Sequence, residues 1–93
     1  MALAYFMMGQ YEDAAACAHR SLQEYSETMS GLRIGSASNA HLGRMEEAQR
    51  LATRARAVDP ALTLSKVSQL IPLRRPGDMD RYLEGLRLAG LPE

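Results

Sequence analysis

The segment from His41 to Pro60, HLGRMEEAQRLATRARAVDP, decides the fold class of this chain. Gly43 follows an apolar stretch and suits the position just after a helix, where glycine adopts a left-handed backbone conformation at least cost. After Gly43, apolar and small residues recur at three- and four-residue spacing, which predicts an amphipathic helix. They are Met45, Ala48, Ala52, Ala55 and Val58. We expect this helix to end at Asp59-Pro60, because the proline ring clashes with a continuing helical carbonyl.

The same arrangement occurs 34 residues earlier, at Gly9. Each of the two glycines is followed two residues later by a large side chain, Tyr11 or Met45. Helical spacing again follows the glycine, at Tyr11, Ala14, Ala18, Leu22 and Tyr25. The chain therefore holds two copies of one helical hairpin, in which a short turn joins antiparallel helices. The small side chains on both stripes allow neighbouring helix axes to approach closely.

Three further helices are predicted from the same kinds of signal. One runs from about Met29 to Leu42 and directs Leu32, Ser36, Ala37 and Ala40 inward, although Gly31 and Gly35 each weaken it by about 0.5–1 kcal/mol. A short helix from Leu64 to Leu70 follows the N-cap candidate Thr63 and is closed by Pro72. The last helix covers about Gly77 to Ala89, with Met79, Tyr82, Leu83 and Leu86 on one face and Gly90, Leu91 and Pro92 ending it. No segment has a strand pattern, so the predicted fold class is all-α.

Composition indicates one small soluble domain. The chain has 93 residues, its eleven basic and eleven acidic residues cancel, and 46% hydrophobic with 24% charged residues is ordinary for a globular protein. The single cysteine, Cys17, excludes an internal disulfide and suits a reducing compartment, so we expect a cytoplasmic protein. The opening MALAYFMMG lacks a signal-peptide pattern and is too short to cross a bilayer. We interpret it as a helix cut by the start of the chain.

The 34-residue unit resembles the tetratricopeptide repeat (TPR). Residues 29–62 resemble one full repeat, through Ser36, Gly43, Ala48, Ala55 and Pro60, with Met45 where the family has tyrosine. Residues 1–28 resemble a partial repeat that lacks the start of its first helix. The chain departs from the family at Leu32 and Ser21, and in having no proline after Tyr25. Residues 63–93 do not follow the repeat and are similar to capping helices at the C-terminal ends of bacterial multidomain proteins, in which such repeats follow a nucleotide cyclase or a winged-helix regulatory domain.

The resemblance implies a single domain of antiparallel helical hairpins stacked as a right-handed superhelix with C-terminal capping helices. It also implies binding of a peptide or a partner helix on the concave face made by the first helix of each hairpin. The matching positions are Leu3, Phe6, Met7, Ser30, Arg33, Ala37, Ala40 and His41. The identity of such a protein or peptide partner is not implied.

Two other interpretations of the apolar N-terminal positions stay open. Leu3, Phe6 and Met7 can simply pack against upstream helices, since a repeat unit cannot cover its own apolar face. Alternatively, the truncated N-terminal face pairs with a second copy, and we expect a homodimer on this ground. In that case the chain is a structural or regulatory tail of a signalling protein such as a nucleotide cyclase, with no external ligand.

The remaining polar residues do not form a recognisable catalytic pattern. His19 and His41 fall on different hairpins, and Cys17 lies in an apolar helix where free cysteine behaves as a small hydrophobe. Glu46 and Glu47 precede Arg50 by four and three residues, so that arginine-rich segment is interpreted as a solvated helix face. Arg74 and Arg75, just before a helix, are the better candidates for an anion. We expect no enzymatic activity, no cofactor or metal, and neither nucleic acid nor membrane as a partner.

Overall fold

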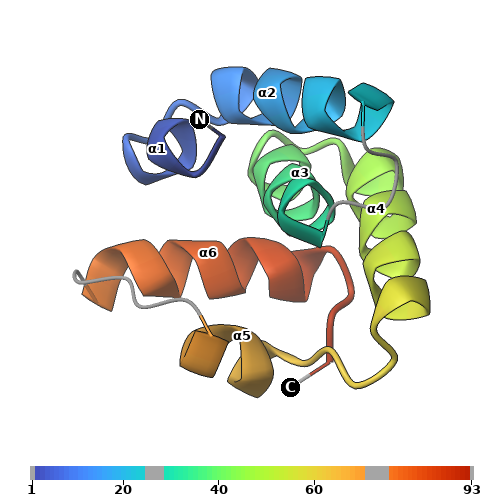
Figure 1. The fold of residues 1–93 in the computed structure, drawn as a ribbon. Coiled ribbons are helices and arrows are strands. Elements are labelled where there is room, and N and C mark those ends of the chain that lie inside the picture. Colours follow the sequence, from blue (N-terminus) through green and yellow to red (C-terminus); the bar gives the residue numbers. More distant parts are fainter. Residues whose placement is uncertain (1, 25–28, 71–75, 93) are drawn as a thin grey trace.

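The described residues of the chain form six α-helices and no strand (Figure 1). A computed structural model describes residues 2–24, 29–70 and 76–92. The helices are α1 (Ala2–Met7), α2 (Tyr11–Glu24), α3 (Met29–His41), α4 (Met45–Val58), α5 (Leu64–Leu70) and α6 (Pro76–Leu88). The predicted all-α fold is therefore confirmed. Tyr25, Pro72, Arg74 and Arg75 lie outside the described residues.

Three glycine turns end α1, α3 and α6 in the same way. Gly9, Gly43 and Gly90 have φ angles of 77°, 81° and 103°, which residues with a Cβ rarely adopt. At each turn, the residue that follows the glycine donates its amide to the carbonyl five positions earlier in the chain, as from Gln10 to Tyr5 at 2.9 Å. The glycine itself donates its amide to the carbonyl three positions earlier, as from Gly9 to Phe6. This is the Schellman arrangement, which satisfies helix carbonyls that would otherwise lack donors. The expected role of all three glycines is confirmed.

The two predicted hairpin units have the same local geometry. In each, a glycine turn leads into a helix of 14 residues, α2 or α4, and these helices begin at Tyr11 and Met45. Helix α1 packs against α2, and α3 packs against α4, while α2 also packs against α3. The three alanines of the α4 stripe are buried, but Met45 and Val58 are exposed. We expected both to lie on the apolar stripe; they are instead the first and last residues of α4, and the alanines between them fill the contact.

Helix α3 is the centre of the molecule and lies between α2, α4 and α6 (Figure 1). Small residues allow these close contacts, because a Cβ added to Gly35 would stand 2.9 Å from Leu51 Cδ1 of α4. The glycines that weaken α3 as an isolated helix therefore bring its neighbours near. Two buried polar side chains on α3 donate to carbonyls of the preceding turn: Ser36 Oγ to Leu32 O at 2.6 Å, and Asn39 Nδ2 to Gly35 O at 2.8 Å.

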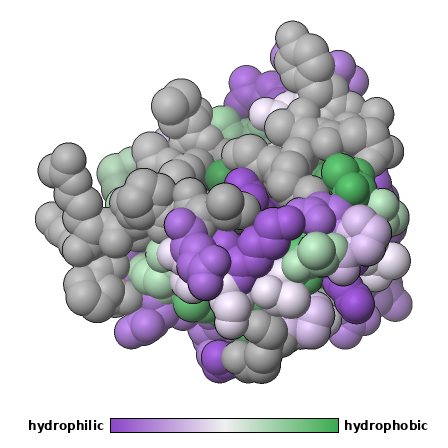
Figure 2. Space-filling view, turned by 60° about the horizontal axis from the view of Figure 1, so that its bottom comes forward, coloured by the Kyte–Doolittle hydropathy of each residue, from purple (hydrophilic) through white to green (hydrophobic). Residues whose placement is uncertain are grey.

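The last two helices close one side of α3. Thr63 caps α5 as predicted, since its Oγ1 accepts from the Lys66 amide at 3.2 Å. Helix α5 packs against α6, and the Leu64 amide donates to the Pro92 carbonyl at 2.8 Å. Helix α6 in turn packs directly on α3. Figure 2 brings this α5 and α6 side forward and shows hydrophilic residues over much of the coloured surface, with small separate apolar areas.

Gly85 sets how closely α6 approaches α3. A Cβ at Gly85 would stand 2.9 Å from the Cα, Cβ and O atoms of Ala37, so backbone would have to move. We expect Gly85→Ala to lower the free energy of unfolding by about 1–3 kcal/mol, although alanine is the better helix former. Urea unfolding followed by circular dichroism measures this change.

Gly77 is the matched control, because it lies in the same helix and a Cβ there meets nothing within 4 Å. Gly77→Ala should leave stability unchanged or raise it by up to about 1 kcal/mol. Equal stability of the Gly85 and Gly77 variants would show that the α3–α6 contact tolerates an added methyl group.

Candidate functional site

The face predicted to bind a partner is covered by α6 of the same chain. Phe6 and Ala37 are fully buried, and Ala40 is nearly so, while Met7, Arg33 and His41 are half-buried. The side chains of Leu3 and Ser30 lie outside the described residues. The described members of this set therefore do not form an open concave face, because α6 packs over them. Contact between these residues and a partner protein stays a prediction.

Four rings fix α6 to the first three helices. The Phe6 ring of α1 contacts Tyr11, His41 and Tyr82, with centroid separations of 5.2, 5.7 and 5.3 Å. The Tyr11 and His41 rings stack at 4.6 Å with an interplanar angle of 12°. Tilted and edge-on pairs of this kind add stabilisation beyond the area they bury. The cluster therefore joins α1, α2, α3 and α6 through a single residue from each.

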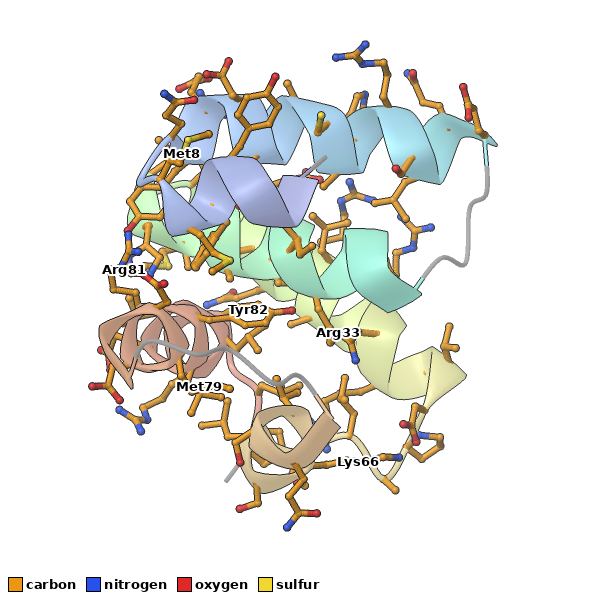
Figure 3. All side chains as sticks on the ribbon, turned by 60° about the vertical axis from the view of Figure 1, so that its left-hand side comes forward. Met8, Arg33, Lys66, Met79, Arg81 and Tyr82 are labelled. Carbon is orange, nitrogen blue, oxygen red and sulfur yellow. The ribbon has the colours of Figure 1, made fainter. Side chains whose placement is uncertain are left out.

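Arg81 of α6 joins the same elements by hydrogen bonds. Its guanidinium donates to the Met7 carbonyl at 2.8 Å, to Tyr11 Oη at 3.2 Å, and to Asp78 Oδ1 at 2.6 Å within α6. The Met7 carbonyl is one of those at the C-terminal end of α1, where a positive charge is favourable. His41 Nε2 donates to the Arg81 carbonyl at 2.7 Å. Figure 3 shows the Arg81 side chain on the side of α6 that is nearer to Met8.

Tyr82 is the largest fully buried side chain of this face. Its hydroxyl and Arg33 Nε are buried without a hydrogen-bond partner, although the two side chains lie toward each other in Figure 3. Burial raises the pKa of Tyr82 to about 12, because the tyrosinate would lose its hydration, and the positive charge of Arg33 opposes this rise. This face is a packed interface within the chain, with Tyr82 held neutral.

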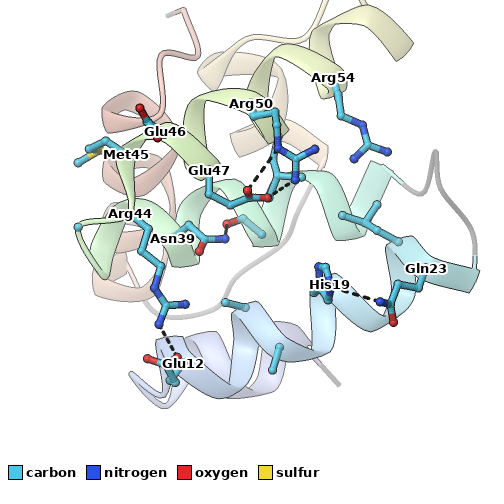
Figure 4. Close-up of a pocket in the computed structure, with 16 residues that line it drawn as sticks. Glu12, His19, Gln23, Asn39, Arg44, Met45, Glu46, Glu47, Arg50 and Arg54 are labelled. Atoms are coloured by element: carbon cyan, nitrogen blue, oxygen red, sulfur yellow. Dashed lines mark hydrogen bonds and ion pairs between the residues drawn. The ribbon is translucent and has the colours of Figure 1, made fainter.

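The open site lies on the other side of α3, between α2 and α4. It is a groove with a volume of about 1070 Å³ (Figure 4). Its lining residues are Glu12, Ala15, Ala16, His19, Leu22, Gln23, Gly35, Asn39, Gly43, Arg44, Met45, Glu46, Glu47, Arg50, Leu51 and Arg54. Small and apolar residues of α2 and α3 form much of its floor, while charged residues of α4 and polar residues of α2 form its rims.

One ion pair crosses the groove at its turn end. Arg44, just before α4, donates to Glu12 of α2 at 2.6 Å, and both side chains are at least half exposed. Further along α4, Arg50 pairs with Glu47, the residue three before it. On the facing wall, His19 and Gln23 of α2 are hydrogen-bonded to each other at 3.3 Å. The expectation that the arginines of this segment stand on a charged, solvated face is consistent with these pairs.

The sequence pattern did not predict this groove. Its lining includes two α3 residues one turn apart, Gly35 and Asn39, and two neighbouring alanines of α2, Ala15 and Ala16. A pattern of small residues on facing stripes predicts close packing and does not indicate a groove. The available signal was the polar Asn39 within a stripe of small residues, because a buried amide needs partners that alanines cannot supply.

The described residues offer little for metal or covalent chemistry. Within residues 2–24, 29–70 and 76–92, no three histidine, cysteine or carboxylate side chains stand together as metal ligands. Cys17 is half-buried in α2. No helix in these ranges has the length and apolar character needed to cross a membrane.

The raised pKa of Tyr82 predicts how stability depends on alkaline pH. Because the folded-state pKa lies about two units above the ordinary value of about 10, the unfolded chain releases its proton first, and stability falls by about 2–3 kcal/mol between pH 10 and 12. Tyr82→Phe should remove this loss. At pH 7 it should change stability by less than about 1 kcal/mol, because the hydroxyl has no partner to lose. Chemical unfolding at each pH measures both effects.

Tyr11→Phe is the matched control for this prediction. It removes a hydroxyl that accepts a hydrogen bond from Arg81, so it should cost about 1 kcal/mol at pH 7 and leave the Tyr82-dependent alkaline loss in place. If Tyr82→Phe retained the full alkaline loss, the assignment of that loss to Tyr82 would be wrong.

Comparisons with protein-family models, with curated proteins and with solved structures gave no match for this chain. The tetratricopeptide resemblance therefore continues to rest on the 34-residue offset and the signature positions named above, and it stays a prediction.

Proposed function

We propose that this chain is a protein-interaction module of the tetratricopeptide type, and that it binds a polypeptide segment of a partner protein in the groove between α2 and α4. In this proposal the two hairpins stack as in a right-handed superhelix and α5 and α6 cap them. The supporting observation is the contrast between the two sides of α3. One side is packed with aromatic residues of α1 and α6, and the other side carries an open groove.

The shape and chemistry of the groove support binding of a polypeptide. It has a volume of about 1070 Å³ and is bounded by helices on two sides. Its rims alternate charged and polar side chains, while its floor includes Leu22, Gly35 and Leu51. An apolar floor with a polar rim is the usual plan of a protein-binding surface.

A tryptophan substitution that fills the groove tests whether peptides bind there. Ala16 lines the groove from α2 and is exposed, so Ala16→Trp places a large side chain in the groove without disturbing the core. Peptides selected on the wild-type chain from a displayed random library should bind this variant at least about tenfold more weakly, a loss of 1.4 kcal/mol. Fluorescence anisotropy with synthetic versions of the selected peptides measures the affinities.

Ala57→Trp is the matched control, because Ala57 is exposed on α4 and does not line the groove. Selected peptides should bind this variant as they bind the wild type. If every selected peptide bound the two tryptophan variants equally, the groove would not be the binding site. If selection gave no specific binder at all, the interaction function itself would be rejected.

A second candidate function is a tail that forms a homodimer, as part of a longer signalling protein. The observation that favours it is Met8, which is 63% exposed at the end of α1 although it is a large apolar residue. Exposed apolar side chains of this kind often lie at contacts between proteins. Phe6 is fully buried, so it is part of the core of the chain and cannot itself be the exposed dimer contact that we expected.

Sedimentation velocity tests whether the chain forms this homodimer. If the α1 surface that carries Met8 forms a dimer contact, the wild-type chain should sediment as a dimer and Met8→Glu should convert it to a folded monomer. Leu88→Glu is the control, because Leu88 is an exposed apolar residue at the end of α6, 43% exposed. A wild-type chain that is monomeric at all accessible concentrations would exclude the dimer.

A further inference from the structure

Two buried polar groups, one on α3 and one on α6, lack hydrogen-bond partners on the side of α3 that faces away from the groove. They are Arg33 Nε and Tyr82 Oη, and the hydroxyl end of Tyr82 lies toward Arg33 in Figure 3. Tyr82 is fully buried, so its hydroxyl is not exposed to bulk water. Buried polar groups are hydrogen-bonded in the great majority of native structures, and a bound water or ion often explains an exception. The pair therefore marks a place where a third group can bind.

Arg33 also carries a positive charge that no carboxylate neutralises by contact within residues 2–24, 29–70 and 76–92. The ion pairs in these ranges are made by other basic residues. Asp59 interacts with Arg33 electrostatically but forms its ion pair with Lys66, whose Nζ lies 2.6 Å from Asp59 Oδ2. Arg33 is half-buried, and a charge that is withdrawn from water is costly unless an opposite charge is close by. A negative group beside Arg33 would remove part of this cost.

A direct bond between the two side chains would not supply every partner that they need. All nitrogens of a guanidinium are donors, so Arg33 could only donate to the Tyr82 oxygen. The hydrogen of the Tyr82 hydroxyl would then still need an acceptor. A water molecule could accept from both groups, but it would leave the charge of Arg33 unopposed. An anion accepts from both groups and also opposes that charge.

We propose that a small monovalent anion such as chloride binds between α3 and α6, where it accepts hydrogen bonds from Arg33 Nε and Tyr82 Oη. Tyr82 belongs to the same apolar cluster as Leu32 and Leu62, and hydrogen bonds to a charged group are stronger in such surroundings than in water. The bound anion would connect α6 to α3 and stabilise the fold. This site is separate from the groove between α2 and α4, so the proposal does not rest on the proposed function.

Arginine side-chain NMR tests for the anion directly. In a ¹H–¹⁵N spectrum each arginine Nε–H gives one signal, and the signal that is lost in Arg33→Lys is that of Arg33. Titration of the full chain with sodium chloride should shift this signal to saturation, with half-saturation at roughly 1–100 mM. Arg56 is the internal reference, because it is exposed on α4. Its signal should show only the small, non-saturating change that screening by salt produces.

Tyr82→Phe removes the second hydrogen bond to the anion. The half-saturating chloride concentration should rise at least about fivefold, the factor expected for the loss of one hydrogen bond. Tyr11→Phe is the matched control, because it removes a hydroxyl of the same ring cluster that bonds to Arg81, and it should leave half-saturation unchanged. Circular dichroism melting confirms that both variants fold. Added chloride should also raise the melting temperature of the wild type more than that of Tyr82→Phe at the same ionic strength.

Three results would overturn the anion site. If the Arg33 signal changed with salt only as the Arg56 signal does, no anion would bind there. If Tyr82→Phe bound chloride as tightly as the wild type, the hydroxyl would not be one of its ligands. A long-lived water detected beside Tyr82 by NMR and unaffected by chloride would assign the position to water. None of these results affects the groove, which the Ala16→Trp variant tests separately.

Discussion

The packing of α6 against α3 at Gly85 and Ala37 is the contact on which the rest of the structure depends. In a chain this small, the two hairpins alone could bury only part of their apolar surface. Helix α6 supplies Tyr82 and Leu86 to the same core that contains Phe6 and Leu32. It can do so only because Gly85 lets the two backbones come within contact distance. The position of α6 then decides which face of the helices is core and which face is left open as a groove.

Local chemistry made most of the secondary structure predictable. A glycine that follows an apolar helical stretch is recognisable from its neighbours, and all three such glycines, Gly9, Gly43 and Gly90, end helices in the expected geometry. Thr63 as a cap follows from its position before Leu64. Each of these signals acts over four or five residues, so the sequence alone is sufficient to identify it. Helix boundaries accordingly agree to within one residue at the ends of α3 and α6.

Pairing between distant faces was not predictable in the same way. The stripe of Tyr82, Leu83 and Leu86 predicts that α6 buries one face, but it does not say against which helix. Phe6 was expected on an open face because it stands on the first helix of a hairpin, and it is instead covered by Tyr82, which lies 76 positions further along the chain. The groove between α2 and α4 was not predictable for a related reason, because small residues indicate that two helices approach closely but do not indicate where along the helices that approach ends.

The two sides of α3 carry different kinds of polar group, and this difference governs what each side can do. On the α6 side, Arg81 has three acceptors, one of them the Asp78 carboxylate, so its charge is already satisfied within the fold. On the groove side, the ion pairs are exposed, and pairs of this kind contribute little to stability, typically below about 1 kcal/mol. Breaking the Arg50–Glu47 pair would therefore cost the fold little. Removing the Arg81 guanidinium, in contrast, would take away the donor that serves both the Met7 carbonyl and the Asp78 carboxylate.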